Sequence, residues 1–286
     1  MKVLVIGSTV VDVILNVNKM PVIGEDENIN EQSFSIGGCA FNVFHTLRYL
    51  KVDCDLFSPV GKGIYGDYVK KYFHDENILP MIESEQDNGC CYCIVDQSGE
   101  RTFLAMHGGE YLFEEKWFEL LNEKHYDMIY VCGLELEEKT GKNIIAFLKT
   151  RKEQIYFAPS SRFCYIDHFL LAEMMSLKPV LHLSKSEILA FTKFNSIEQA
   201  ASSLYKKTHN LIVVTLGKQG CYYYDGNDHY IKGFETTVVD TIGAGDCHLA
   251  SLMAYQIKGY HIDEALLYAN KLAAKVVGIK GSRLVQ

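Results

Sequence analysis

Apolar and polar residues alternate along the chain in blocks that predict strands and helices in turn. Residues 3–8 form a mostly apolar run, as expected of a strand buried on both faces of a sheet. Residues 41–50 then show helical spacing. Further predicted strands are 55–60, 128–132, 154–157, 180–183 and 211–216, and further helices are 68–74, 142–149 and 197–207. This order predicts an α/β fold with a mostly parallel central sheet covered by helices on both faces.

Two stretches depart from this order. Residues 10–36 show no helical pattern, and their apolar positions alternate on both sides of a turn-rich segment. Residues 90–106 are also strand-like, with a turn at 97–99. We expect these stretches to form a small separate β-sheet that closes over a site as a lid. The alternative is that they are ordinary edge strands of the main sheet.

The stretch 240–246, Asp-Thr-Ile-Gly-Ala-Gly-Asp, lies between a strand-like run at 230–239 and an apolar-striped helix predicted at 247–258. The first N–H groups of a helix lack partners within the helix, and the helix dipole adds partial positive charge there. Gly243 and Gly245 allow tight backbone geometry and close approach by a ligand. The stretch therefore predicts an anion pocket suited to phosphate.

Asp246 lies beside this pocket, on the first turn of the predicted helix. A carboxylate next to a phosphate site is well placed to take a proton from an attacking hydroxyl. The alternative is that Asp246 is a simple helix N-terminal acid and the glycines form a tight turn, which is the commoner outcome for an isolated motif. The chain contains no Gly-x-x-x-x-Gly-Lys-Ser/Thr loop, which excludes phosphate binding by a P-loop.

A second group of candidates lies near the N-terminus. Asp12 follows the first predicted strand, at its carboxyl end, where open α/β sheets bind ligands. An unpaired acid at such a position is costly unless it binds something, and polyol hydroxyls are natural partners. Gly37 and Gly38 precede a predicted helix, and Asn42 lies on its first turn. A turn residue, a hinge and a helix cap are equally open interpretations of Asp12, the glycine pair and Asn42.

The loop from Gly61 to Gly66 matches the dinucleotide-binding fingerprint and supports a rival function, an NAD(P)-dependent oxidoreductase. That fingerprint normally follows the first strand of a βαβ unit, and an acid ends the second strand. Here the loop follows a later strand, and the acid would fall in a polar turn at 83–85. We therefore interpret the loop as a structural turn before the helix at 68–74. A third possibility is a non-catalytic sugar-binding regulator.

Composition narrows the class of protein. The chain has 286 residues, 48% of them hydrophobic and 22% charged, which suits one α/β domain over residues 1–286 with lid strands from 10–36 and 90–106. The net charge of -8 and the pI of about 5.7 argue against a nucleic-acid partner and for a cytoplasmic protein. No apolar run is long enough to cross a membrane. The nine cysteines are scattered through apolar runs, so we expect reduced core thiols rather than a zinc site.

Taken together, these motifs resemble those of the ribokinase/PfkB family of sugar and nucleoside kinases. The Asp-Thr-x-Gly-Ala-Gly-Asp stretch at 240–246 matches that family's signature, and the earlier motifs follow in its order: Asp12, Gly37-Gly38, Asn42 and Thr215-x-Gly217. The resemblance implies a ribokinase-like three-layer sandwich with a small β-sheet lid. It also implies ATP-dependent phosphorylation of a hydroxyl, taken to be primary, of a small sugar or nucleoside.

The resemblance also implies roles for individual residues. Asp246 would be the catalytic base, and the N–H groups of Gly243, Ala244 and Gly245 would hold the transferring phosphoryl group. The acceptor would be bound by Asp12, Gly37, Gly38, Asn42 and Glu135, and the nucleotide by Thr215, Gly217, Thr241 and Asn270. ATP and Mg²⁺ would be required, with a monovalent cation such as K⁺ near Asp240. In some members of the family the lid pairs into a homodimer.

Several positions depart from the family pattern. The usual Asn-x-x-Glu appears as Ser184-x-x-Glu187, so Glu187 would support the metal through water. Ala40 replaces the third glycine of the substrate loop. Arg162 follows Ala158-Pro159 and either binds a phosphate or carboxylate of the acceptor or is a surface arginine. Four aromatic residues either stack on a base or simply pack: Phe41, Phe103, His107 and Tyr111. Ribose, fructose, phosphorylated hexoses and nucleosides all remain open as acceptors.

Overall fold

A computed structural model describes residues 1–78, 82–281 and 284 of the chain. Its central sheet has eight strands in the order β14-β13-β12-β11-β10-β9-β1-β4. Neighbours from β4 to β12 pair in parallel, and β13 and β14 form an antiparallel hairpin at one edge. The strands are β1 Lys2–Ile6, β4 Asp53–Phe57, β9 Met128–Cys132, β10 Gln154–Ala158, β11 Val180–Ser184, β12 Ile212–Thr215, β13 Gly220–Tyr224 and β14 Asp228–Lys232.

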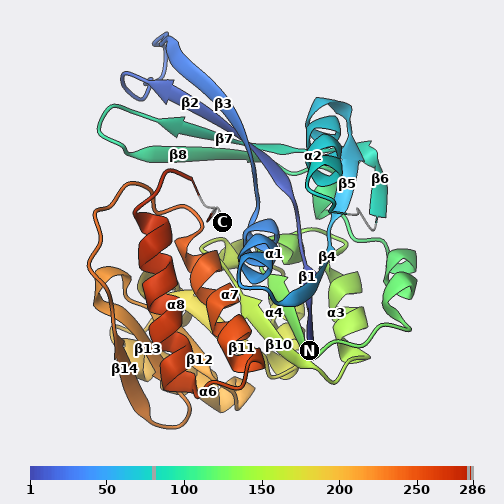
Figure 1. Cartoon of the computed structure of the whole chain (residues 1–286), viewed down its shortest axis with the longest axis vertical. Coiled ribbons are helices and arrows are strands. Elements are labelled where there is room, and N and C mark those ends of the chain that lie inside the picture. The colour runs from blue at the N-terminus through green and yellow to red at the C-terminus, as the bar shows by residue number, and fades with distance from the viewer. Residues whose placement is uncertain (79–81, 282–283, 285–286) are drawn as a thin grey trace.

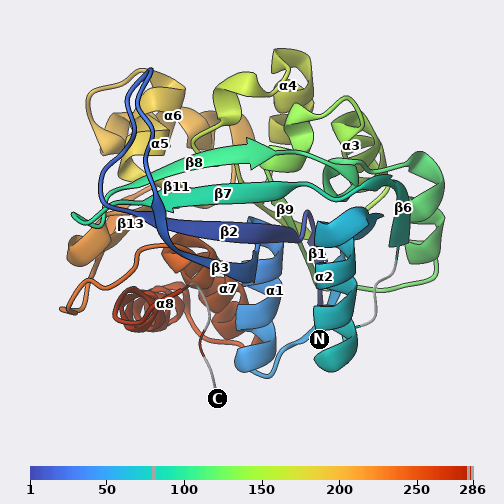
Figure 2. The ribbon, with the colours of Figure 1, turned by 90° about the horizontal axis from the view of Figure 1, so that it is seen from above.

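Helices cover both faces of this sheet, as predicted (Figure 2). Side chains alternate between the faces along a strand, so Val3 and Val5 pack on one side of β1 while Leu4 and Ile6 pack on the other. All four are fully buried, which explains the apolar run at the N-terminus. One face carries α1 Cys39–Tyr49, α2 Gly63–Asp75, α7 Ala244–Ile257 and α8 Ile262–Val277. The other carries α3 Gly141–Lys149, α4 His168–Ser176, α5 Lys185–Thr192 and α6 Ile197–Thr208.

A separate four-stranded sheet confirms the prediction of a small second sheet, and we refer to it as the lid sheet. Its order is β3-β2-β7-β8, and it projects from the body beside the N-terminal end of α7 (Figure 1). The β2–β7 pair is parallel and the two outer pairs are antiparallel. Gly99 makes the β7–β8 turn with a φ of 83°, in the left-handed region. The strands are β2 Val10–Val17, β3 Ile29–Gly37, β7 Cys90–Val95 and β8 Arg101–Met106.

The glycines of the dinucleotide-like loop serve close backbone packing. Gly61 lies in β5 Pro59–Lys62, Gly63 and Gly66 lie in the first turn of α2, and β5 pairs with β6 Ile82–Asp87 outside the central sheet. A Cβ on Gly61 would lie 2.4 Å from the backbone N of Asn88, and one on Gly66 would lie 2.1 Å from the carbonyl O of Gly61. The loop is thus a structural turn, although α2 begins at Gly63 and not near residue 68.

The expected strand at 230–239 is wrong for most of its length. Strand β14 ends at Lys232, and residues 233–243 form a loop. Its β-branched Val238 and Val239 are more than half exposed and line cavities, so these valines are not packed in a sheet. Helix α7 starts at Ala244, earlier than predicted, which places Asp246 at its third residue.

Five 3-10 helices complete the described elements: η1 Gly109–Tyr111, η2 Glu115–Leu121, η3 Leu134–Glu137, η4 Phe163–Tyr165 and η5 Gly217–Gln219. Within residues 1–78, 82–281 and 284, no helix has both the length and the apolar character needed to cross a membrane.

Candidate active site

Two cavities meet at the N-terminal end of α7. The larger has a volume of about 830 Å³ and lies between the lid sheet and the body. The smaller, of about 300 Å³, lies among the loops after β12 and β14 and helices α7 and α8. Gly243 and Asp246 line the larger cavity, and Ala244 and Gly245 line the smaller. Thr241 lines both, so the predicted anion pocket lies where the two cavities join.

The backbone at this helix end leaves its first amides without a side-chain cap from the residues that the structure describes. Gly243 is the N-cap with a φ of 73°, and no side chain in the described part of the chain caps the helix. The Ala244 N–H donates a long bond of 3.3 Å to the carbonyl O of Thr241. A Cβ on Gly245 would meet no atom within 4 Å, so open space adjoins the amides. The partial positive charge of α7 is therefore directed at the junction of the cavities.

Asp246 is partly buried on the first turn of α7, and Asn42 Nδ2 donates a hydrogen bond of 2.8 Å to its Oδ2. Burial raises the pKa of Asp246 to about 6, since desolvation disfavours the charged carboxylate. The bonds from Asn42 and the Cys39 thiol oppose this rise, while the charge of Glu187 adds to it. A carboxylate with a pKa near 6 is well suited to accept a proton close to neutral pH.

Asp12 lies within lid strand β2, and not at the end of β1 as expected. Asp12, Gly38 and Asn42 line the larger cavity together. Gly37 has a supporting position, because a Cβ there would lie 2.0 Å from Asp12 Oδ2 and displace the carboxylate. Gly38 adopts a φ of 99°, and a Cβ there would lie 2.6 Å from the carbonyl O of Ser8. Gly38 is thus required by the backbone at this end of the cavity, and Gly37 leaves room for the Asp12 carboxylate.

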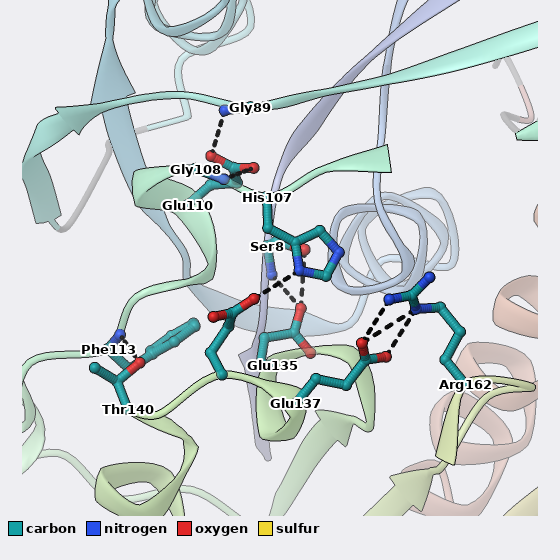
Figure 3. A network of polar contacts seen from close by, with 11 residues as sticks. Ser8, Gly89, His107, Gly108, Glu110, Phe113, Glu135, Glu137, Thr140 and Arg162 are labelled. Carbon is teal, nitrogen blue, oxygen red and sulfur yellow. Dashed lines mark hydrogen bonds and ion pairs between the residues drawn. The ribbon is translucent and has the colours of Figure 1, made fainter. Parts of the chain in front are cut away.

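Glu135 does not reach the cavity. It is fully buried on η3, and its Oε1 accepts bonds of 2.7 Å from the Ser8 N–H and 2.9 Å from Ser8 Oγ (Figure 3). Burial raises the pKa of Glu135. Its Oε2 has no hydrogen-bond partner among the described residues. Glu135 is therefore engaged by Ser8 and does not line the larger cavity, so its role toward the acceptor stays a prediction.

Arg162 lines the larger cavity, but its charge is already matched. Its Nε donates to Glu137 Oε1 at 2.9 Å and its Nη2 donates to Glu137 Oε2 at 2.7 Å (Figure 3). Such two-point pairing fixes the planar guanidinium and neutralises it. Arg162 is thus neither a free surface arginine nor a free anion-binding group.

Three of the predicted aromatic residues line the larger cavity. They are Phe103 of the lid, His107 and Tyr111. The rings of His107 and Tyr111 stack with centroids 3.8 Å apart. Phe41 is fully buried and stacks on Phe73 instead, so it belongs to the core between α1 and α2.

All four residues predicted to contact a nucleotide line the smaller cavity: Thr215, Gly217, Thr241 and Asn270. Asn270 Oδ1 lies 3.0 Å from His248 Nε2, and its Nδ2 donates to the backbone of β14 at 3.0 Å. His248 Nδ1 in turn lies 2.8 Å from His182 Nε2. Burial lowers the pKa of both histidines, that of His248 to about 4, so both are neutral near pH 7. Sequence reasoning missed this pair because each histidine lies in an apolar run.

Two departures from the family pattern have local explanations. Ser184 caps α5, with its Oγ 3.2 Å from the Glu187 N–H, while Glu187 Oε2 accepts the Ser184 N–H at 2.7 Å. This capping box holds Glu187 at the wall of the larger cavity. Ala40 is fully buried, and its Cβ lies 2.6 Å from where a Cβ on Gly7 would be. Gly7 thus leaves room for the methyl group that Ala40 adds.

An ion pair between lid and body was not foreseen. Arg101, the first residue of β8, donates through Nη1 to Asp240 Oδ1, and both residues line the larger cavity. Asp240 Oδ1 also accepts the Ile242 N–H at 2.8 Å, and Oδ2 accepts the Gly281 N–H at 3.0 Å. Burial alone would raise the pKa of Asp240, but these bonds lower it overall. No local pattern at Arg101 marks it as the partner of a residue 139 positions away.

Comparison with known families decides the class of protein. The model of the pfkB family of carbohydrate kinases matches residues 1–285. The chain belongs to the PfkB family. Members of this family are sugar and nucleoside kinases, so the protein is a phosphotransferase. PfkB membership decides against the oxidoreductase and the non-catalytic regulator.

Individual relatives span nearly the whole chain. YegV of Escherichia coli strain K12, named an uncharacterized sugar kinase, is 30% identical over 98% of this chain and 89% of its own length. An ATP-dependent ribose-1-phosphate kinase of Halopiger xanaduensis is 26% identical over 95% of this chain and 90% of its own. The crystal structure of ribokinase from Thermotoga maritima has a TM-score of 0.86 at 20% identity, covering 98% of this chain and 94% of that one. The ribokinase-like fold of this PfkB protein is thereby confirmed.

Proposed function

We propose that the protein transfers the terminal phosphoryl group of ATP to a hydroxyl of a small sugar or nucleoside, with Asp246 as general base. The observation that carries this proposal is the position of Asp246 and the uncapped α7 terminus between the two cavities. The larger cavity would hold the acceptor and the smaller the nucleoside part of ATP. Transfer across the junction requires the acceptor hydroxyl and the terminal phosphate to meet beside Asp246.

In this scheme the hydroxyl oxygen attacks phosphorus, the bond from phosphorus to the bridging oxygen of ADP breaks, and the hydroxyl proton passes to Asp246. The hydrogen bond from Asn42 fixes the orientation of the carboxylate before the reaction. Amides of Gly243, Ala244 and Gly245 would stabilise the charge on the moving phosphoryl group. The Ala244 N–H would exchange its long bond to Thr241 for the phosphoryl oxygen.

Mg²⁺ is used by kinases of this family, and it neutralises charge on the terminal phosphates of ATP when bound. The described residues contain no group of three or more His, Cys, Asp or Glu side chains arranged to hold a metal directly. This fits Mg²⁺, which keeps several waters and is bound through few carboxylates together with substrate phosphates. We assign Glu187 as the carboxylate that would hold these waters, because its capping box fixes it near Asp246.

A monovalent cation at Asp240 does not fit the described residues. The carboxylate already accepts two backbone N–H groups and is paired with Arg101. We therefore propose that Arg101 supplies the positive charge at this position and that K⁺ is not required.

The pH dependence tests Asp246 as base. We expect kcat/KM to fall about tenfold per pH unit below pH 6, because only the ionised carboxylate accepts a proton and its pKa is about 6. Asn42→Ala should move this acidic limb to higher pH, since the bond from Asn42 lowers the pKa of Asp246. The same profile measured for Asn16→Ala, on an exposed part of the lid, is the control. A rate independent of pH between 5 and 8 would contradict the assignment.

The histidine pair tests the nucleotide cavity. His248→Leu leaves Asn270 and His182 without their shared partner, and a buried polar group without a partner costs about 1–3 kcal/mol. We expect the KM for ATP to rise about tenfold, as a loss of that size implies, while the KM for the acceptor stays unchanged. His74→Leu, at an exposed site on α2, is the matched control. Equal changes in both KM values would argue that the variant disturbs the whole site.

Two broader properties complete the proposal. The lid leaves Phe34, Leu104 and Met106 about half exposed, which supports a homodimer formed through the lid. The acidic composition supports a cytoplasmic location and no nucleic-acid partner.

A further inference from the structure

Every basic side chain that the structure places on the wall of the larger cavity is paired with a carboxylate. Arg162 is paired with Glu137 at two points, and the Glu137 side chain is only 7% exposed. His107 Nδ1 lies 2.8 Å from Glu138 Oε1 (Figure 3). The third is Arg101, paired with Asp240. Across residues 1–78, 82–281 and 284, these three are the basic residues lining this cavity.

The same wall carries further acids. Asp12, Glu100, Glu187 and Asp246 line the cavity in addition to Asp240. Carboxylates therefore outnumber basic side chains on this wall, and the partial positive charge of the α7 terminus lies at the junction with the smaller cavity. A phosphate or carboxylate on the acceptor would have to lie among like charges or break an existing pair. Both are unfavourable in a partly buried site.

We propose that the acceptor is uncharged, a sugar or nucleoside that carries hydroxyl groups and no phosphate or carboxylate. The inference rests on the proposed function, since it concerns the acceptor of the same transfer. Polar groups suited to hydroxyls line the cavity at Asp12, Asn42, Ser160 and Ser161. The stacked rings of His107 and Tyr111 offer an apolar surface to a sugar or base.

Glu137 is the specificity-determining residue in this proposal. It touches no acceptor itself but holds the Arg162 guanidinium, which would otherwise attract an anion. The ion pair thereby disfavours anionic acceptors, because it leaves the Arg162 guanidinium without free charge to bind them. One relative is named a ribose-1-phosphate kinase, and ribose 1-phosphate is an anionic acceptor. The proposed preference for an uncharged acceptor would therefore distinguish this protein from that relative.

Matched pairs of neutral and phosphorylated acceptors test the inference. ADP release would be measured with ribose against ribose 1-phosphate and ribose 5-phosphate, and with adenosine against adenosine 5′-monophosphate. We expect kcat/KM for the better neutral compound to exceed that of its phosphorylated partners by about 100-fold, as like-charge contact implies. Glu137→Gln should lower this ratio about tenfold, because the released Arg162 guanidinium can then bind the phosphate of the acceptor. Glu173→Gln, which removes the carboxylate partner of surface Lys149, should leave the ratio unchanged.

Binding of inorganic phosphate without ATP, measured by calorimetry, gives a readout independent of turnover. We expect phosphate to bind Glu137→Gln at least about tenfold more tightly than the unmodified protein. Equal binding to both proteins, or preference for a phosphorylated acceptor, overturns the inference. If no compound is phosphorylated but the phosphate result is as expected, the proposed function fails and the charge assignment stands. If only phosphorylated acceptors react, the kinase assignment stands and this inference fails.

Discussion

Replacing Asp246 with asparagine should reduce kcat by about 10³- to 10⁴-fold, as expected when a general base is lost. The amide keeps the size of the side chain and an oxygen for the Asn42 bond, so ATP should still bind. Steady-state kinetics and a nucleotide-binding titration measure the two effects separately. Loss of both together would indicate a disturbed α7 terminus.

The same variant should be more stable than the unmodified protein near pH 7. The pKa of Asp246 is higher in the folded protein than its ordinary value of 3.8, so ionisation destabilises the fold as pH rises from about 4 to above 6. Asparagine removes this penalty, on the order of 1–3 kcal/mol. Thermal unfolding at pH 7 and pH 4 should show the gain only at the higher pH.

Glu264→Gln is the matched control for this prediction. Glu264 lies exposed on the first turn of α8, so it tests the simpler interpretation that Asp246 is only a helix N-terminal acid. We expect its removal to leave kcat unchanged. Undiminished turnover by Asp246→Asn would refute the base assignment.

Arg101→Met should lower kcat/KM about 10- to 100-fold in a buffer free of small monovalent cations, since breaking a partly buried ion pair typically costs about 1–3 kcal/mol. The variant leaves the Asp240 carboxylate, which is 6% exposed, without its cation. It also releases the lid from the loop that leads into α7. Added K⁺ should restore part of the activity of the variant and have no effect on the unmodified protein.

Kinetics in tetramethylammonium and potassium buffers measure this effect. Thermal unfolding should show a loss of several degrees, because each kcal/mol corresponds to about 2–4 °C for a chain of this size class. Lys62→Met, which breaks the exposed pair with Glu85, is the control and should change neither quantity. A K⁺ requirement in the unmodified protein would contradict the role given to Arg101.

The layered fold was predictable because buried apolar residues recur along the sequence with the periodicity of strands or helices. Strand β1 packs on both of its faces, which requires a continuous apolar run. Helix α1 packs on one face, which requires apolar residues at helical spacing. The lid strands were found because alternation replaced helical spacing there. The loop 233–243 was misread because its exposed valines have strand-like composition without a strand partner.

Candidate site residues were predictable to different degrees. The stretch 240–246 combines a helix start, glycines and an acid within seven positions, so its position at the cavity junction agrees with local reasoning. Glu135 was expected at the acceptor by resemblance alone, and burial against Ser8 removes it from the cavity. Arg101 and His248 were missed because nothing within a few residues of either marks its partner.

The sequence by itself determined the alternating α/β layers, the small second sheet and the glycine-rich helix end at the cavities, since each depends on residues that are close along the chain. Only the tertiary structure decided the charge state of the site. Asn42 meets Asp246 across 204 positions, Arg101 meets Asp240 across 139, and Glu137 meets Arg162 across 25. Such pairs depend on how distant segments pack, and local periodicity carries no information about which charges will be neutralised.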